Sequence, residues 1–207
     1  MSLFITFEGG EGCGKTTQAG LLRDKLEQQN ISVVLTHEPG GTSLGAEIRK
    51  LLKKKRHFSI SPQAELFLFV ASRVQLLAEL IRPALEVKGT MAVICDRFTD
   101  STAVYQGYGR GLDLTTVETV NNMVTENIKP DFTILLDLSP EQGLARKQSL
   151  KDCFELEDLS FHRRVREGYL KMAAAEPDRW MVIDASLPKS KIAEIIWNSV
   201  SKLLLPS

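Results

Sequence analysis

The sequence predicts an α/β fold in which a five-stranded parallel sheet is flanked by helices on both faces. Short apolar runs alternate with longer segments of helical periodicity, and this order is typical of successive β-α-β units. The apolar runs contain few polar residues, as expected for strands that are buried on both faces. The expected strands cover residues 3–8, 31–36, 91–95, 132–136 and 180–183.

Helices are expected between these strands, where apolar residues recur at intervals of three or four. The segment 15–29, for example, carries Ala19, Leu22 and Leu26 on one face. The other expected helices cover residues 44–54, 62–85, 114–128, 140–148, 157–175 and 189–204. Ser61 and Pro62 are a good N-cap and first residue for the helix 62–85, and Pro83 should kink or terminate it.

The composition is that of an ordinary globular protein, with 207 residues of which 43% are hydrophobic and 25% charged. A chain of this length predicts a single domain, 1–207. The 26 basic and 26 acidic residues balance, which argues against a nucleic-acid-binding surface. There is no signal-peptide pattern and no apolar run long enough for a membrane span, and the three cysteines are widely spaced. We therefore expect a cytoplasmic protein that binds neither nucleic acid nor membranes.

Residues 9–16 read Gly-Gly-Glu-Gly-Cys-Gly-Lys-Thr and fit the pattern G-x-x-x-x-G-K-[ST]. The segment follows an expected strand and opens an expected helix, which is the context of a phosphate-binding P-loop. Backbone N–H groups of such a loop surround nucleotide phosphates, and the helix N-terminus adds positive charge. Among α/β folds, the sequence therefore predicts the P-loop NTPase fold. The residues expected to bind ATP are Gly9, Gly10, Glu11, Gly12, Cys13, Gly14, Lys15, Thr16 and Thr17.

Within the P-loop, Lys15 should reach the β- and γ-phosphates, and the Thr16 hydroxyl should coordinate Mg²⁺. The motif alone does not name a reaction, because switches, motors and metabolic kinases share it. Neither D-x-x-G nor [NT]-K-x-D occurs in the chain, which argues against a regulatory GTPase.

A second group of polar residues begins directly after the expected strand 91–95. Ligands of open α/β sheets bind at the carboxyl ends of the strands. Asp96 is therefore placed to hold the metal or its waters, and Arg97 to hold a substrate phosphate. A strand-end carboxylate in a surface salt bridge is the alternative reading.

Two helical faces could form an acceptor pocket. Residues 98, 101, 102 and 105 share one face and combine hydroxyls with an aromatic ring, which suits a base and a sugar. Phe69 and Arg73 are neighbours on another helix and could stack on a base and hydrogen-bond to it. The alternative is ordinary packing, with Phe69 in the core and the Arg73 stem lying along apolar surface.

Taken together, the motifs resemble the thymidylate kinase family along essentially the whole chain. The matching segments are Phe7-Glu8-Gly9, Glu38-Pro39-Gly40-Gly41-Thr42, the pair Phe69 and Arg73, the run 96–112, and the stretches 136–146 and 161–169. The resemblance implies a nucleoside monophosphate kinase that transfers the γ-phosphate of ATP to dTMP, giving dTDP and ADP in dTTP biosynthesis. It also implies Mg²⁺ as the cofactor.

The resemblance further assigns roles to individual residues. It implies that Arg97 holds the dTMP phosphate, that Phe69 stacks on thymine and that Tyr105 closes on the deoxyribose. The implied acceptor site comprises Glu11, Pro39, Arg49, Phe69, Arg73, Arg97, Thr102, Tyr105 and Gln106. In this site, the resemblance implies that Glu11 contacts the 3′-hydroxyl region and that Arg73 contacts the base and the monophosphate. Thr102 would contact a polar edge of thymine, and Gln106 would contact the base. Pro39 and Arg49 would lie at the border of the site. The implied catalytic set is Lys15, Asp96, Arg97 and Arg146, with the metal at Thr16 and Asp96.

The chain departs from the family pattern at two places. His37 stands where the family commonly has arginine before Glu-Pro-Gly-Gly-Thr, so that any charge there depends on pH or is absent. The expected lid, at about 146–155, has Cys153 where an arginine is expected. Arg146 is then the favoured lid cation, with Lys147 and Lys151 as alternatives.

A homodimer is expected through the helix 62–85, because this helix has more apolar surface than one sheet face needs. The resemblance implies a dimer as well. Two other functions stay open at this point. A deoxynucleoside kinase would prefer thymidine to dTMP, and a nucleotide-binding regulatory protein would bind nucleotide without turnover.

Overall fold

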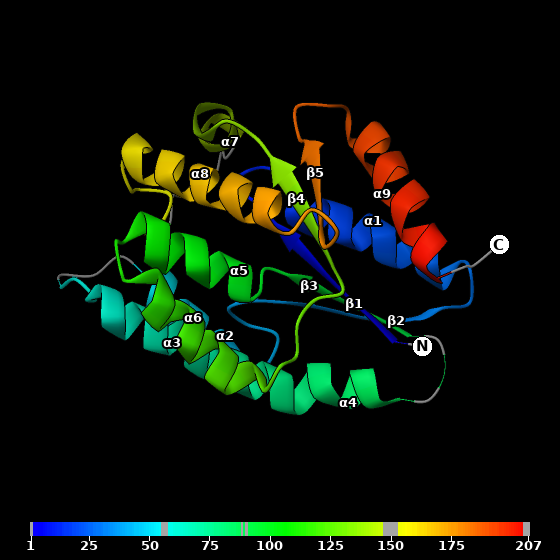
Figure 1. The fold of residues 1–207 in the computed structure, drawn as a ribbon, viewed down its shortest axis with the longest axis horizontal. Coiled ribbons are helices and arrows are strands. Elements are labelled where there is room, and N and C mark those ends of the chain that lie inside the picture. Colours follow the sequence, from blue (N-terminus) through cyan, green and yellow to red (C-terminus); the bar gives the residue numbers. More distant parts are fainter. Residues whose placement is uncertain (1, 55–57, 88, 90, 147–152, 205–207) are drawn as a thin grey trace.

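The computed structural model describes residues 2–54, 58–87, 89, 91–146 and 153–204. A sheet of five parallel strands in the order β2-β3-β1-β4-β5 lies at its centre (Figure 1). The predicted fold class is thus confirmed. The strands are β1 (Ser2–Glu8), β2 (Ser32–His37), β3 (Met91–Asp96), β4 (Phe132–Asp137) and β5 (Trp180–Asp184).

The strands after β1 each end one residue later than expected from the apolar runs. The additional residues are polar, namely His37, Asp96, Asp137 and Asp184. The pairing His37↔Asp96 between β2 and β3, and Asp137↔Asp184 between β4 and β5, shows that ladder bonding continues past the buried segment. Acidic side chains consequently gather at the carboxyl edge of the sheet.

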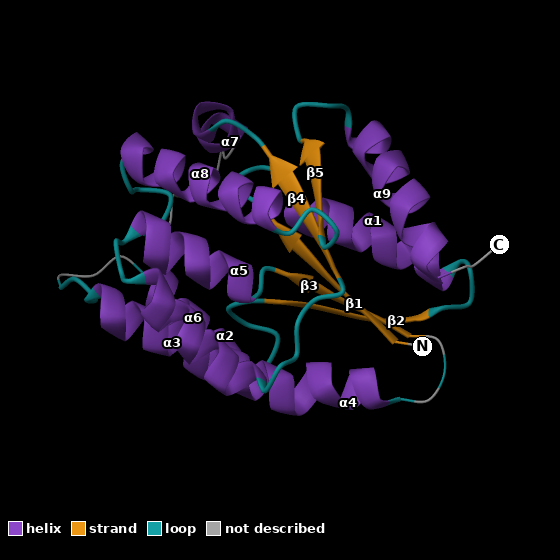
Figure 2. Ribbon diagram, in the orientation of Figure 1, coloured by secondary structure: helices purple, strands orange, loops and turns teal. Residues whose placement is uncertain are grey.

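Helices cover both faces of the sheet (Figure 2). On one face, α1 (Lys15–Glu27) and α9 (Lys189–Leu204) pack on Leu3, Ile5 and Phe7 of β1. Side chains alternate along a strand, so that Phe4, Thr6 and Glu8 face the opposite helical layer. There Phe4 packs against the helix that follows α2.

Four further helices are α2 (Ser43–Lys53), α6 (Leu114–Thr125), α7 (Pro140–Arg146) and α8 (Leu159–Ala175). The helix expected at 114–128 ends earlier, because Glu126 and Asn127 have φ angles of 49° and 68°. The helix expected at 157–175 starts later, because the Asp158 carboxylate accepts a hydrogen bond from the Phe161 N–H at 2.6 Å and caps it. The end of the helix expected at 140–148 lies outside the described residues.

The helix expected at 62–85 has three parts: α3 (Pro62–Leu76), the π-helical segment η1 (Leu77–Ile81) and α4 (Arg82–Glu86). The Ser61 hydroxyl accepts a hydrogen bond from the Ala64 N–H at 3.3 Å, as expected for an N-cap. Pro83 lacks an N–H to donate to the preceding turn. The chain therefore passes this point through a π-helical segment instead of ending the helix. No helix among the described residues is long and apolar enough to span a membrane.

A second π-helical segment lies beside the carboxyl edge of the sheet. The short helix α5 (Thr99–Thr102) leads directly into η2 (Ala103–Gly109). The helical face predicted for residues 98–105 therefore exists; it spans α5 and the first turn of η2, and Tyr105 lies in the π-helical part. Such segments are frequent at functional sites.

Candidate active site

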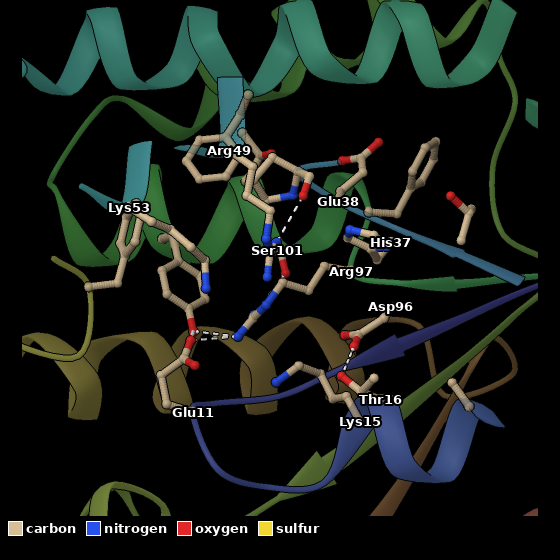
Figure 3. Close-up of a pocket in the computed structure, with 18 of the residues that line it drawn as sticks. Glu11, Lys15, Thr16, His37, Glu38, Arg49, Lys53, Asp96, Arg97 and Ser101 are labelled. Atoms are coloured by element: carbon tan, nitrogen blue, oxygen red, sulfur yellow. Dashed lines mark hydrogen bonds and ion pairs between the residues drawn. The ribbon is translucent and has the colours of Figure 1, made fainter. Parts of the chain in front are cut away.

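A cavity of about 750 Å³ opens at the carboxyl edge of the sheet (Figure 3). Most of the predicted site residues line it, namely Glu11, Gly12, Gly14, Lys15, Thr16, Thr17, Pro39, Arg49, Phe69, Arg73, Asp96, Arg97, Thr102, Tyr105, Gln106 and Arg146. The other predicted residues, Gly9, Gly10 and Cys13, belong to the base of the P-loop. The Cys13 side chain is buried and its Sγ lies 3.1 Å from the Gly10 carbonyl oxygen.

The P-loop connects β1 to α1 as its sequence predicted. Gly12 and Gly14 have φ angles of 69° and 96°, which residues with a Cβ adopt rarely. The Lys15 Nζ donates hydrogen bonds to the carbonyl oxygens of Gly10 at 2.7 Å and Gly9 at 3.1 Å. This lysine is thus folded over the loop and lines the cavity.

Two oxygen-bearing side chains meet beside the P-loop. The Thr16 hydroxyl donates a hydrogen bond to Asp96 Oδ2 at 2.5 Å, which brings α1 and the end of β3 together (Figure 3). Oxygen atoms of this type are the ligands that Mg²⁺ prefers, and Mg²⁺ sites commonly use one or two protein ligands besides substrate phosphates. The residue types present therefore fit the expected ion.

Arg97 is held at both its backbone and its side chain. Its φ angle is 74°, and its N–H donates to the Phe7 carbonyl oxygen at 3.0 Å. One end of the guanidinium, Nη2, donates to Glu11 Oε1 at 2.7 Å and to the Tyr105 hydroxyl at 3.0 Å. Figure 3 shows the side chain extended toward Glu11. A cation of fixed orientation therefore stands opposite the P-loop.

Arg73 lies deeper, with only 1% of its surface exposed. Its guanidinium forms an ion pair with Glu38 at 2.6 Å and donates to Asn121 Oδ1 at 2.7 Å and to Thr102 Oγ1 at 2.8 Å. Burial raises the pKa of Glu38, and the adjacent Arg73 lowers it. Neither Glu38 nor Asn121 was predicted as a site residue, although Glu38 opens the Glu-Pro-Gly-Gly-Thr motif.

Aromatic rings form one wall of the cavity. The ring centroids of Phe69 and Phe154 are 5.9 Å apart, and those of Tyr105 and Phe154 are 6.1 Å apart. Phe154 lies in the segment expected to form the lid and was not predicted as a site residue. Its aromatic character was the only available signal.

Two further predicted residues are engaged with protein groups at the border of the cavity. The Gln106 Nε2 donates to Glu65 Oε1 at 2.9 Å, and Arg49 Nη1 donates to the Pro39 carbonyl oxygen at 2.8 Å. Burial, with the nearby Arg49 charge, lowers the pKa of His37. This shift favours the neutral form of the His37 imidazole.

The expected lid is described only in part. Arg146, its first residue, is exposed and donates to the Ala185 carbonyl oxygen at 3.0 Å. Both alternative lysines, Lys147 and Lys151, lie outside the described residues. Cys153 is half-buried, with its Sγ 3.2 Å from the Lys54 carbonyl oxygen.

Known proteins provide an independent comparison with this site. The family model described as thymidylate kinase matches residues 7–196. The chain belongs to the thymidylate kinase family. A thymidylate kinase from Dehalococcoides mccartyi is 52% identical over 205 residues, covering 99% of this chain and 98% of that protein. One from Trichlorobacter lovleyi is 46% identical over 213 residues, covering 99% and 100% of the two chains.

The fold also matches a solved structure. The crystal structure of thymidylate kinase from Ehrlichia chaffeensis is similar with a TM-score of 0.76 and 36% identity. The match covers 96% of this chain and 98% of that one. The resemblance inferred from the motifs is thereby confirmed, and so is the enzyme class.

Proposed function

We propose that the cavity brings the γ-phosphate of ATP, bound at the P-loop, into line with the phosphate of dTMP, bound at Arg97. The enzyme phosphorylates dTMP to dTDP, the reaction of its family. The observation that supports these residue roles is convergence: Lys15, the Thr16–Asp96 pair and Arg97 all line one cavity. Phosphoryl transfer needs little covalent chemistry from the protein, and positioning and charge neutralisation do most of the work.

On the donor side, the P-loop N–H groups and the N-terminus of α1 would hold the ATP phosphates. The Lys15 ammonium now binds the carbonyl oxygens of Gly9 and Gly10 and would turn to the β- and γ-phosphates. Thr16 and Asp96 would hold Mg²⁺. When bound, this ion would neutralise phosphate charge.

On the acceptor side, Arg97 would exchange part of its contact with Glu11 for the dTMP phosphate. Glu11 and Arg97 are each 15% exposed in their side chains, so that a ligand can reach the pair. Phe69 and Phe154 would enclose the base, and Tyr105 would lie at the sugar. Arg73 and Thr102, which already bind each other, would present polar atoms to thymine from the floor. Gln106, Pro39 and Arg49 complete the border.

Acceptor choice tests the proposal. A coupled ADP-release assay with Mg-ATP would offer dTMP, dUMP, dCMP, dGMP, AMP and thymidine in parallel. We expect strong preference for dTMP. Preference for thymidine would instead indicate a nucleoside kinase, and ATP binding without turnover on any of the six acceptors would indicate a nucleotide-binding protein.

Lys15→Ala tests the donor side in the same assay. Loss of a preorganised cationic group commonly lowers the rate about 10²- to 10³-fold, and we expect a kcat decrease of that size. The thermal unfolding midpoint should stay close to that of the wild type, since the hydrogen bonds of Lys15 Nζ, to the carbonyl oxygens of Gly9 and Gly10 and to Cys13 Sγ, all lie within its own loop. A near-normal kcat in the folded variant would contradict the role of Lys15.

We also propose that the enzyme is a homodimer through α3. Much of the apolar surface expected to be in excess is buried within the protomer, including Leu66, Val70 and Leu76. However, Phe67 and Val74 are 59% and 45% exposed. These two residues are seven positions apart, and Ala71 and Ala78 extend the same exposed face. A stripe of this kind suits packing against a second copy of the helix.

We further propose that the enzyme works in the cytoplasm. Cys13, Cys95 and Cys153 are all free thiols in the structure. Unpaired cysteines fit a reducing compartment, where disulfides are rare.

A further inference from the structure

Glu8, the last residue of β1, is a buried carboxylate for which the phosphate-binding roles above provide no use. Its Oε1 accepts a hydrogen bond from the Phe98 N–H at 2.8 Å. Its Oε2 accepts from the Ser101 hydroxyl at 2.6 Å and from the Tyr169 hydroxyl at 2.7 Å. The side chain is completely buried. The end of β1, the start of α5 with its N-cap residue Phe98, and α8 therefore meet at this carboxylate.

The same two hydroxyls bind Arg97. Its Nη1 donates to Ser101 Oγ at 3.1 Å and to the Tyr169 hydroxyl at 3.2 Å. The other end of the guanidinium, Nη2, faces Glu11 and the cavity. Glu8 thus contacts Arg97 through two hydroxyls on the side away from the expected dTMP phosphate.

The numbers of available donors and acceptors determine which group donates in each of these hydrogen bonds. Each hydroxyl has one hydrogen to donate and lone pairs to accept. Ser101 and Tyr169 lie 2.8 Å apart and could bond to each other, but an ionised carboxylate is the stronger acceptor. With Glu8 ionised, both hydroxyl hydrogens point to Oε2. Their lone pairs then point to Arg97 Nη1, which can only donate.

The backbone of Arg97 is held by the same carboxylate. Arg97 has a φ angle of 74°, an unfavourable conformation for a residue with a Cβ. The N–H of Arg97 bonds to the Phe7 carbonyl oxygen, and the next N–H, that of Phe98, bonds to Glu8. The last two residues of β1 therefore secure the turn on which Arg97 stands.

We propose that Glu8 is a positioning residue for Arg97, which orients the guanidinium for the acceptor phosphate through the Ser101 and Tyr169 hydroxyls and secures its backbone through Phe98. The proposal rests on the role of Arg97 in the proposed function. It predicts that Glu8 acts on the use of dTMP and leaves the use of ATP nearly unchanged.

The titration of Glu8 should make the use of dTMP depend on pH, and this dependence can be measured. Burial, and after it the neighbouring Asp100 carboxylate, raise the pKa of Glu8 to about 7, against the lowering effect of Arg97. The other charged or titratable groups in this region are Asp100, Arg179, Tyr169 and Cys95, and Asp100 is paired with Arg179 at 2.8 Å. As pH rises through 7, Glu8 loses its proton and the two hydroxyls turn toward it. The use of dTMP should improve over that range.

Glu8→Gln is the direct test, because it keeps the shape but places an N–H₂ group where Oε2 accepts. A hydrogen bond to a charged group commonly contributes about 10- to 100-fold in an equilibrium. We expect the KM for dTMP to rise by about 10-fold or more, with the KM for ATP changed less than about twofold. Between pH 6 and 8, the kcat/KM of the variant for dTMP should change only because the substrate phosphate titrates, with a second pKa of about 6.

Asp100→Asn is the matched control. Asp100 is also a buried carboxylate, 5% exposed, but its partner is Arg179. We expect a lower unfolding midpoint and an unchanged KM for dTMP at pH 8. A general effect of removing a buried carboxylate would instead raise the KM for dTMP in both variants, and would overturn the proposal.

Two more variants complete the experiment. Tyr169→Phe should raise the KM for dTMP in the wild type and have little further effect in Glu8→Gln, since both act through one network. The same Tyr169→Phe variant carries the test if Glu8→Gln does not fold. Arg97→Ala distinguishes failure of the positioning role of Glu8 from failure of the acceptor role of Arg97. A raised KM for dTMP in Arg97→Ala with a normal one in Glu8→Gln and Tyr169→Phe overturns the positioning role alone. A normal KM in Arg97→Ala overturns the acceptor role of Arg97 as well.

Discussion

At the scale of single residues, Arg73 is a charged group that is both buried and part of the cavity lining. Its side chain is 1% exposed, and Nε, Nη1 and Nη2 of its guanidinium each donate a hydrogen bond within the protein. Glu38 comes from the loop after β2, Asn121 from α6 and Thr102 from α5. A buried ion pair of this kind is stable only when its remaining hydrogen bonds are satisfied.

Removal of the Arg73 charge should therefore destabilise the fold. In Arg73→Met, the buried Glu38 carboxylate has no compensating cation, and such a loss commonly costs about 3–5 kcal/mol. Arg163→Met is the control, since Arg163 pairs with Glu141 on the surface, with 61% and 47% of the side chains exposed. Exposed pairs contribute about 0–1 kcal/mol. Urea denaturation would measure the free energy of unfolding of both variants, and an equal decrease in the two would contradict the importance of the buried pair.

At the scale of elements, the P-loop and α7 approach each other more closely than two ordinary residues allow. A Cβ on Gly143 would lie 2.2 Å from the Glu11 carbonyl oxygen, and a Cβ on Gly12 would lie 2.0 Å from the Gly143 carbonyl oxygen. Both contacts are with backbone atoms, which cannot rotate away. The position of the phosphate-binding loop thus depends on a helix more than 100 residues later in the chain.

Gly143→Ala tests this contact by whether it raises or lowers the stability of the protein. Helix propensity alone favours alanine over glycine by about 1 kcal/mol. The contact with Glu11 should reverse that, so that we expect lower stability and a raised KM for ATP as the P-loop shifts. Gly20→Ala in α1 is the control, because no atom lies within 4 Å of its added Cβ. There we expect a gain of about 0.5–1 kcal/mol. A gain of equal size in both variants would contradict the close approach.

At the scale of the whole molecule, the parallel sheet collects residues that are distant in sequence at one edge. The ends of β1 and β3, with the loop after β2, supply Glu8, Asp96 and Glu38 to the region of the cavity. The helical layer on the α3 side encloses that edge and leaves the apolar stripe of α3 on its outer surface. This exposed stripe is the basis of the proposed dimer.

Phe67→Asp should weaken that dimer. A charge within an apolar helix interface is costly to bury, so that sedimentation velocity should show wild-type dimers and variant monomers at the same concentration. Met123→Asp on α6 is the control, since Met123 is 69% exposed and lies outside the stripe. Wild-type monomers, or a dimer unaffected by Phe67→Asp, would contradict the proposal.

The sequence by itself determined the order of strands and helices, the P-loop and the Asp96-Arg97 pair after β3. These features depend on residues close together in the chain, because periodicity, caps and glycine spacing act locally. It also showed the family, since its motifs extend over nearly the whole chain.

The partners of the buried charges were decided only by the tertiary structure. Arg73 and Glu38 are 35 positions apart, Arg97 and Glu11 are 86 apart, and Glu8 and Tyr169 are 161 apart. No local pattern specifies which hydroxyl or carboxylate faces a given guanidinium. The packing of the sheet against α3, α5 and α8 brings these groups together, and burial then requires each of them to be hydrogen-bonded.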